Sequence, residues 1–205
     1  DTTIPISMDE MIFLVRAVCR GTNKSLVVAD MPFMSYQASV EDAVRNAGRF
    51  VKEGGAEAVK LEGGRAYTAQ IKAIIDAGIP VMGHVGLLPQ SYHLSSGYRI
   101  QGKTKLEAEK ILTDAMAIQD SGSFSVVLEG IPANLADKIT KKLDIPTIGI
   151  GAGPYCDGQI QVYHDILGLY GDIIPKHTKR YANLGIEIQQ KLAKYKSEVE
   201  AKIFP

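Results

Sequence analysis

The chain alternates short apolar runs, rich in β-branched residues, with longer segments of helical periodicity. Apolar runs bounded by glycine and polar residues predict strands buried on both faces, and helical segments between them predict the covering layer of a parallel sheet. Six strands are predicted, at residues 25–29, 58–62, 81–84, 125–129, 147–150 and 160–163.

Local signals mark the ends of the helices between these strands. A serine or threonine followed three residues later by an acidic residue fits a capping box, in which side chains satisfy free backbone N–H groups. The pairs are Ser7 with Glu10, Ser39 with Asp42, and Thr104 with Glu107. Glycine favours the left-handed cap that ends a helix. The glycines that follow predicted helices are Gly21, Gly54, Gly78 and Gly122.

The predicted strands end in polar or glycine-rich residues: Asp30, Glu62, His84, Glu129 and the turn at 151–153. In β/α folds the loops after the carboxyl ends of the strands build the site, and in a barrel they converge on one mouth. Acidic ends spread over several strands favour a (β/α)8 TIM barrel over an open doubly wound sheet, which gathers its ligands at one switch point.

The length of the chain bears on this architecture. An eight-stranded barrel needs about 250 residues, whereas the chain has 205 and six predicted strands. We therefore expect a single barrel domain over residues 1–205 whose first two strands lie upstream of Asp1. Residues 183–202 predict a final amphipathic helix that covers the barrel or a partner subunit. Its apolar stripe is Leu184, Ile188, Leu192, Tyr195 and Val199.

Composition narrows the class of protein. Hydrophobic residues make up 45% of the chain, which suits a globular domain with a sizeable core. Basic and acidic residues number 23 each, so no net positive field favours nucleic acid. No apolar run approaches the ~20 residues of a membrane span. Cys19 and Cys156 fit no metal spacing, which indicates reduced thiols in a cytoplasmic protein.

Two acidic residues at the ends of neighbouring predicted strands indicate a metal site. Asp30 alone would be typical of a turn, but Glu62, in the stretch AVKLEGG (58–64), ends the next strand. Two such carboxylates can share a Mg²⁺ ion, which takes oxygen ligands and keeps several waters. Side chains alternate along a strand, so Lys60 shares a face with Glu62. Lys60 forms an internal ion pair with Glu62, binds the carboxylate of an anionic substrate, or does both.

Glu129 and His84 are the candidates for proton transfer and substrate contact. Glu129 lies between VVL and GIP, and burial among apolar groups disfavours a charged carboxylate, which suits a general acid or base. The alternative is a glutamate on a solvent-exposed rim. His84 contacts a substrate carbonyl or is satisfied by neighbouring backbone.

Two loops complete the pattern. GIGAG (149–153) lacks the final glycine of a dinucleotide fingerprint, so we interpret it as a tight turn that allows close ligand approach. Residues 86–103 form a segment too long for an ordinary barrel loop, which predicts a lid or a surface used in subunit contacts.

Several blocks of sequence, in order along essentially the whole chain, match one known family. They are LVVADMPFMSY, AVKLEGG, GHVGLLPQS, SGYRIQG, VVLEGIP, IGIGAG, CDGQIQVYHD and IPKHTKRY. The chain resembles the ketopantoate hydroxymethyltransferases of pantothenate and coenzyme A biosynthesis. The resemblance implies a Mg²⁺-dependent (β/α)8 barrel that transfers a one-carbon unit from 5,10-methylenetetrahydrofolate to 3-methyl-2-oxobutanoate. It also implies homo-oligomers, often decamers.

Carried over by motif, the resemblance implies roles for five residues. Asp30 is a metal ligand that also contacts substrate, and Glu62 completes the metal site directly or through water. Lys60 binds the substrate carboxylate, His84 contacts the substrate and Glu129 accepts the proton. The family's Gly-Asp-Ser block, with a further metal-binding aspartate and a substrate-binding serine, has no counterpart here. We expect it upstream of Asp1.

Two other interpretations stay open. One is a different Mg²⁺-dependent barrel enzyme that forms enolates from α-keto acids, related to phosphoenolpyruvate mutase or isocitrate lyase. The other is a non-catalytic, oligomeric scaffold. Dependence on folate separates the first of these from the transferase.

Overall fold

The computed structural model describes residues 2–94, 97, 99–170 and 178–205, and the chain divides into two units, Asp1–Gln159 and Ile160–Pro205. In the first unit the helices are α1 (Met8–Gly21), α2 (Val40–Arg49), α3 (Thr68–Asp76), α4 (Lys105–Asp120) and α5 (Ala133–Thr140). Its short helical turns are the π-helix η1 (Phe50–Gly54) and the 3₁₀ turns η2 (Arg65–Tyr67) and η3 (Pro89–Ser91). Its strands are β1 (Val28–Asp30), β2 (Ala58–Lys60), β3 (Val81–Gly86), β4 (Ser125–Glu129), β5 (Thr147–Ile150) and β6 (Gly158–Gln159). The second unit contains α6 (Tyr163–Leu167) and α7 (Leu184–Glu200).

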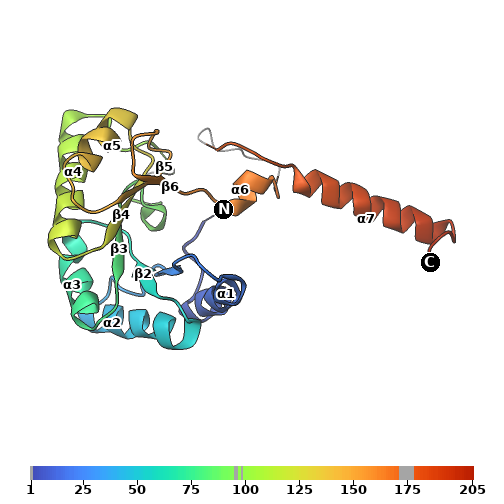
Figure 1. Cartoon of the computed structure of the whole chain (residues 1–205), viewed down its shortest axis with the longest axis horizontal. Helices are drawn as coiled ribbons and strands as arrows, with labels where there is room; N and C mark the ends of the chain where they lie inside the picture. The colour runs from blue at the N-terminus through green and yellow to red at the C-terminus, as the bar shows by residue number, and fades with distance from the viewer. Residues whose placement is uncertain (1, 95–96, 98, 171–177) are drawn as a thin grey trace. The chain divides into compact units, whose positions relative to one another are not determined.

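The strands form one parallel sheet in chain order, from β1 to β6. A doubly wound sheet reverses its strand order at a switch point, and the strands in the described part of the chain show no reversal. The sheet curls into a half-barrel with α2 to α5 along its outer side (Figure 1). The structure therefore confirms an α/β fold with a parallel sheet, wound in the manner of a barrel.

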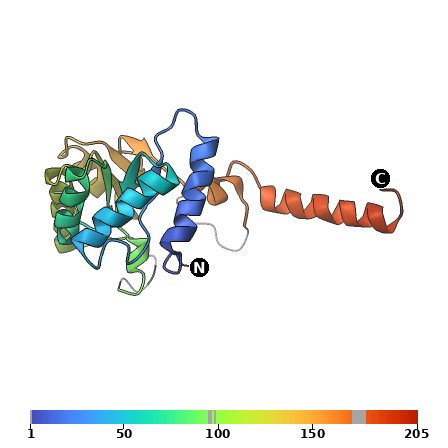
Figure 2. The same ribbon diagram turned by 90° about the horizontal axis from the view of Figure 1, so that it is seen from below.

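The core lies between the sheet and these helices, and a second view shows the same layering (Figure 2). Val59 and Leu61 are fully buried in it together with Ile118 of α4. α4 approaches β3 closely because Gly83 has no side chain; a Cβ there would collide with Ile118. The alternation predicted for AVKLEGG is confirmed: the apolar residues enter the core, and Lys60 points to the opposite face, toward Asp30.

The predicted strands agree with the structure best in the middle of the sheet. The predictions at 125–129 and 147–150 match β4 and β5 in full. β1 begins at Val28, three residues later than predicted, and Leu26 before it is 53% exposed. A side chain that stays in water gains nothing from the sheet, so the run of apolar letters overstates the strand.

The predicted strand at 160–163 is wrong. The residues that pair with β5 are Gly158 and Gln159, and the ladder ends there. Ile160 and Val162 are exposed, and Tyr163 begins α6. An apolar run indicates a strand only where those side chains are buried.

The helix caps follow the sequence signals in part. Ser7 and Thr104 form full capping boxes with the glutamates three residues on. Ser39 accepts a hydrogen bond from the Asp42 N–H, but the shorter Asp42 side chain returns to the Ser39 hydroxyl and not to its backbone.

The glycine caps are also confirmed in part. Gly78 and Gly122 have the positive φ of left-handed caps, at 86° and 93°. The predictions for Gly21 and Gly54 are wrong, because both are the last residues of their helices. Gly55, with φ of 79°, takes the left-handed cap after η1.

In the second unit, α7 agrees with the predicted final helix, with Asn183 at its N-cap. Four of the five residues in its apolar stripe are exposed, and Leu184 is half-buried. Ile188, Leu192, Tyr195 and Val199 are exposed to 49%, 62%, 52% and 44%. Of the predicted lid at 86–103, residues 95, 96 and 98 lie outside the described part of the chain, and its function as a lid stays a prediction.

Candidate active site

Polar side chains from four consecutive strands meet at the carboxyl end of the sheet. Asp30 ends β1, Lys60 ends β2, His84 lies near the end of β3 and Glu129 ends β4. Backbone hydrogen bonds between neighbouring strands hold this edge, including Met31 N–H to the Lys60 carbonyl at 2.9 Å. The structure therefore brings these four residues to one edge of the sheet.

Asp30 and Lys60 form an ion pair. They are direct partners in the register of β1 and β2, so their side chains leave the sheet at the same level. Lys60 Nζ lies 2.7 Å from Asp30 Oδ1. Burial opposes the charge of Lys60, but the carboxylates of Asp30 and Glu62 outweigh it and raise the pKa of Lys60 above its ordinary value. The predicted direct pair of Lys60 with Glu62 is corrected: the partner in contact is Asp30, and Glu62 acts from farther away.

His84 links this pair to Glu129. Its Nδ1 lies 3.5 Å from Lys60 Nζ, and its Nε2 lies 3.2 Å from Glu129 Oε2, without the alignment of a hydrogen bond. An ammonium group offers only hydrogens, so Nδ1 accepts and a neutral ring carries its hydrogen on Nε2, toward Glu129. The side chain is 2% exposed.

Two expectations change with this geometry. His84 is held by side chains and not by neighbouring backbone. Glu129 does not lie in purely apolar surroundings, because its side chain is 20% exposed and faces the imidazole.

Glu62 lies beyond the end of β2 and is 4% exposed. One carboxylate oxygen, Oε2, accepts a hydrogen bond from the backbone N–H of Gln90 at 3.0 Å. Burial raises the pKa of Glu62 above its ordinary value, although His84, Lys60 and the Gln90 N–H all favour the ionised form. A bound cation would favour ionisation further.

Tyr36 and Gln90 surround Glu62, and neither was predicted from the sequence. The Tyr36 hydroxyl lies 3.0 Å from the Glu62 carbonyl and 3.1 Å from the Glu62 N–H. Gln90 donates from Nε2 to the Met31 carbonyl at 2.7 Å. Both residues lie in loops, where periodicity carries no signal. The one clue in the sequence is that Tyr36 lies in the family block LVVADMPFMSY and Gln90 in the family block GHVGLLPQS.

The chemistry of the site suits a hard divalent cation. Mg²⁺ is usually held by one or two carboxylates together with waters and substrate oxygens. Asp30 and Glu62 supply two carboxylates, and Oδ1 of Asp30 is the oxygen that lies against Lys60 Nζ. Among the described residues no group of three or more His, Cys, Asp or Glu side chains is placed to hold a metal. The residues present therefore fit Mg²⁺ as a partial ligand set.

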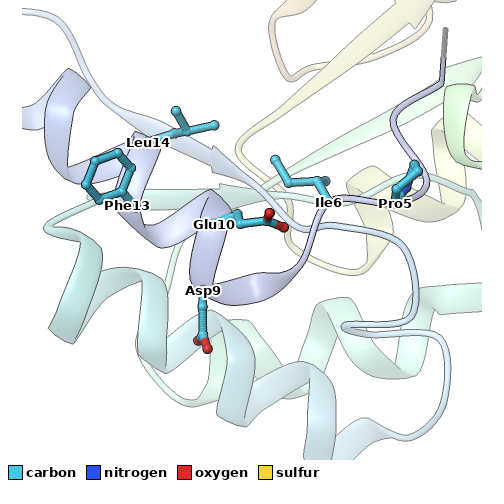
Figure 3. Close-up of a pocket in the computed structure, with 6 residues that line it drawn as sticks. All are labelled: Pro5, Ile6, Asp9, Glu10, Phe13 and Leu14. Atoms are coloured by element: carbon cyan, nitrogen blue, oxygen red, sulfur yellow. The ribbon is translucent and has the colours of Figure 1, made fainter.

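Hollows in the described part of the chain differ in how close they lie to these strand ends. A hollow of 160 Å³ adjoins the ends of β2 and β3, with Gly63, Gly86 and Lys110 among its lining. A larger one, of 630 Å³, is lined by the segment before α1 and by α1 itself (Figure 3). Its lining residues are Pro5, Ile6, Asp9, Glu10, Phe13 and Leu14. None of them is among the polar residues at the strand ends.

A parallel β/α half-barrel with acidic, lysine and histidine side chains at its strand ends defines a class: barrel-type enzymes that act at the carboxyl ends of their strands. The chain belongs to the ketopantoate hydroxymethyltransferase family, whose sequence pattern it matches over residues 1–205. It is 55% identical to the 3-methyl-2-oxobutanoate hydroxymethyltransferase of Carboxydothermus hydrogenoformans, over 100% of this chain and 74% of that relative. The chain is therefore that of a transferase.

Solved structures show the same fold at low sequence identity. A protein from Burkholderia cenocepacia J2315, provisionally assigned as a phosphonomutase, gives a TM-score of 0.58 at 15% identity, over 75% of this chain and 70% of that one. A 2,3-dimethylmalate lyase of the PEP mutase/isocitrate lyase superfamily gives 0.50 at 14% identity, over 70% and 50% of the two chains. In the described residues, no helix has the length and apolar character needed to cross a bilayer.

Proposed function

We propose that the protein transfers a hydroxymethyl group from 5,10-methylenetetrahydrofolate to 3-methyl-2-oxobutanoate, giving 2-dehydropantoate for pantothenate biosynthesis. Family membership supports the reaction type. The observation that carries the proposal is the contact series Asp30, Lys60, His84 and Glu129 at one edge of the sheet. It joins a site for a cation and an anionic substrate to a carboxylate able to accept a proton.

Lys60 binds the carboxylate of the keto acid. Its ammonium group has three hydrogens, so it can contact Asp30 and the substrate together. The raised pKa keeps Lys60 charged, as recognition of an anion requires. His84 offers its Nε2–H on the Glu129 side, where it can contact the substrate as the proton is removed.

Asp30 and Glu62 hold Mg²⁺ in this proposal, and Asp30 also lies against the substrate. When bound, the ion acts as a Lewis acid that stabilises negative charge on the keto oxygen. Positive charge already in place where an oxyanion develops lowers the barrier most.

Glu129 removes the proton from C3 of the keto acid. The resulting enolate carbon forms a C–C bond to the methylene carbon of the folate, whose two C–N bonds break. One water supplies the hydroxyl group and a proton for one of the two nitrogens, and tetrahydrofolate leaves. The Glu129 carboxyl then returns its proton to the leaving amine or to water. Its 20% exposed side chain leaves room for the reacting carbon to approach.

The proposal extends to the whole protein. We place the six strands in a complete (β/α)8 barrel, in a homo-oligomeric enzyme of the cytoplasm that acts on small molecules and binds neither nucleic acid nor membrane. The sequential parallel winding of β1 to β6 supports the barrel, and the exposed apolar stripe of α7 supports association.

The test is product formation by the full-length protein from 3-methyl-2-oxobutanoate and methylenetetrahydrofolate, with Mg²⁺ and with EDTA. The expected result is 2-dehydropantoate that depends on both the folate and the metal ion. Turnover of the keto acid without folate would favour an enolate-forming mutase or lyase. Proteins with names of that kind share this fold. No turnover under either condition would favour the scaffold.

A further inference from the structure

The side chain of Gln90 lies in a buried network that joins three loops. Gln90 is in η3, after β3, and is 8% exposed. Its Nε2 donates to the Met31 carbonyl, after β1, at 2.7 Å. Its Oε1 lies 3.2 Å from the Tyr36 hydroxyl and accepts from Gln37 Nε2 at 3.1 Å. The nitrogen and the oxygen of the amide are therefore both hydrogen-bonded within the protein, which fixes the orientation of the side chain.

The same residue contacts Glu62 through its backbone. The Gln90 N–H donates to Glu62 Oε2 at 3.0 Å, and in the described part of the chain Glu62 Oε1 receives no hydrogen bond. The loop after β3 thus occupies one oxygen of the carboxylate and leaves the other open. A carboxylate held in this way presents one oxygen in a defined direction, as a metal ligand needs.

Tyr36 fixes the backbone of Glu62 in the same network. Its hydroxyl accepts from the Glu62 N–H and has one hydrogen to share between the Glu62 carbonyl and Gln90 Oε1. Burial, with the charge of Glu62 in addition, raises the pKa of Tyr36 far above its ordinary value, so the hydroxyl remains a donor. Gln90 and Tyr36 therefore hold the side chain and the main chain of the same residue.

We propose that Gln90 is a positioning residue for the divalent cation: its amide anchors the loop after β3 so that its own N–H orients the Glu62 carboxylate toward the ion. The inference rests on the proposed function, in which Glu62 binds Mg²⁺. Partners that orient a metal ligand commonly change metal affinity by about 10- to 100-fold when they are lost. The same size of effect is expected here.

The test is Mn²⁺ binding to the full-length protein without substrates, followed by the EPR signal of free Mn²⁺. Gln90→Met keeps the length of the side chain and removes its hydrogen bonds, and we expect it to raise the Kd by about tenfold or more. Tyr36→Phe removes only the hydroxyl, and it provides a second variant with a smaller increase. Excess Mg²⁺ should restore activity to Gln90→Met, because Glu62 itself is still present.

A matched control is Gln119→Met. Gln119 also anchors a loop, accepting from the Asp144 N–H at 2.7 Å, but it lies on α4 away from the strand ends. The Gln119→Met variant should have a lower melting temperature and the same Kd for Mn²⁺ as the wild type. If folded Gln90→Met and Tyr36→Phe both bind Mn²⁺ as the wild type does, the positioning role is wrong while the metal site stands. If the wild type itself binds no Mn²⁺, the proposed metal function fails, and this inference with it.

Discussion

Lys60 is the residue at which the charges of the site meet. It contacts Asp30 and His84, and the carboxylates of Glu62 and Glu129 also raise its pKa. Attraction to these three carboxylates keeps the ammonium group charged despite its burial, and the hydrogen that faces neither Asp30 nor His84 gives it a way to recognise an anion. In the proposed function the same cation pairs with Asp30 and binds the substrate carboxylate.

Replacing Lys60 by methionine tests this role. The variant keeps the aliphatic stem and removes the charge, so a hydrogen bond between charged groups worth about 1.5–3 kcal/mol is lost. The KM for 3-methyl-2-oxobutanoate should rise by about 10- to 100-fold in steady-state assays. Lys72→Met is the control, because its pair with Asp76 is exposed and worth under about 1 kcal/mol. An unchanged KM in Lys60→Met would show that the substrate carboxylate binds elsewhere.

The residues of the site were predictable to the extent that strands carry them. Alternation along AVKLEGG placed Lys60 on the polar face, and chain order placed Asp30 and Glu129 at strand ends. Which carboxylate Lys60 contacts depends on the register of β1 and β2, and register between distant segments leaves no mark in either one. Tyr36 and Gln90 lie in loops whose conformation is set by tertiary contacts.

At the scale of elements, α4 links the helix layer to the site. It contacts β3 and β4, and its Asp114 accepts from the Arg65 N–H in the turn that follows Glu62. The capping box of Thr104 and Glu107 fixes where this helix begins. A substitution at the cap is therefore expected to lower the stability of the fold more than it lowers the rate of the reaction.

Thr104→Ala removes the cap hydroxyl that accepts from the Glu107 N–H. The free energy of unfolding should fall by about 1 kcal/mol in urea titrations, since this is the usual cost of losing such a cap. Thr113→Ala, on the same helix, loses only a hydrogen bond to the Glu109 carbonyl one turn back, and it should change stability by less than about 0.5 kcal/mol. Equal losses in the two variants would contradict the capping role.

Elements with strong local signals were predicted well, and those that depend on partners were not. β4 and β5 each pair with a strand on both sides, and β4 is buried at all but its last residue, whereas β5 is buried at alternate residues. The prediction at 160–163 failed because its apolar side chains are exposed and pairing stops at Gln159. A sequence pattern shows that a side chain favours burial. Whether that side chain is buried depends on contacts with segments elsewhere in the chain.

At the scale of the whole molecule, α7 bears on association. The helix buries none of its residues in the structure, yet it carries the apolar stripe named above. A stripe of this kind is typical of a helix that packs on another surface. Leu192→Asp should lower the mass measured by light scattering on a size-exclusion column, if the homo-oligomer uses this face.

The control for association is Gln190→Asp, which adds the same charge two residues away, on the other side of the helix. It should leave the mass unchanged. Circular dichroism would verify that both variants keep their helix content. A wild-type monomer, or an unaltered mass in Leu192→Asp, would contradict association through α7.

The central claim is that Glu129 removes the C3 proton of a keto acid bound at the strand ends. The most direct measurement is exchange of that proton in D₂O, followed by ¹H NMR with Mg²⁺ and without folate, in the full-length wild type and in Glu129→Gln. Glu109→Gln, an exposed change on α4, serves as the control. We expect exchange in the wild type and the control, and an exchange rate at least about 100-fold lower in Glu129→Gln with substrate binding kept. Exchange at the wild-type rate in Glu129→Gln would contradict the claim.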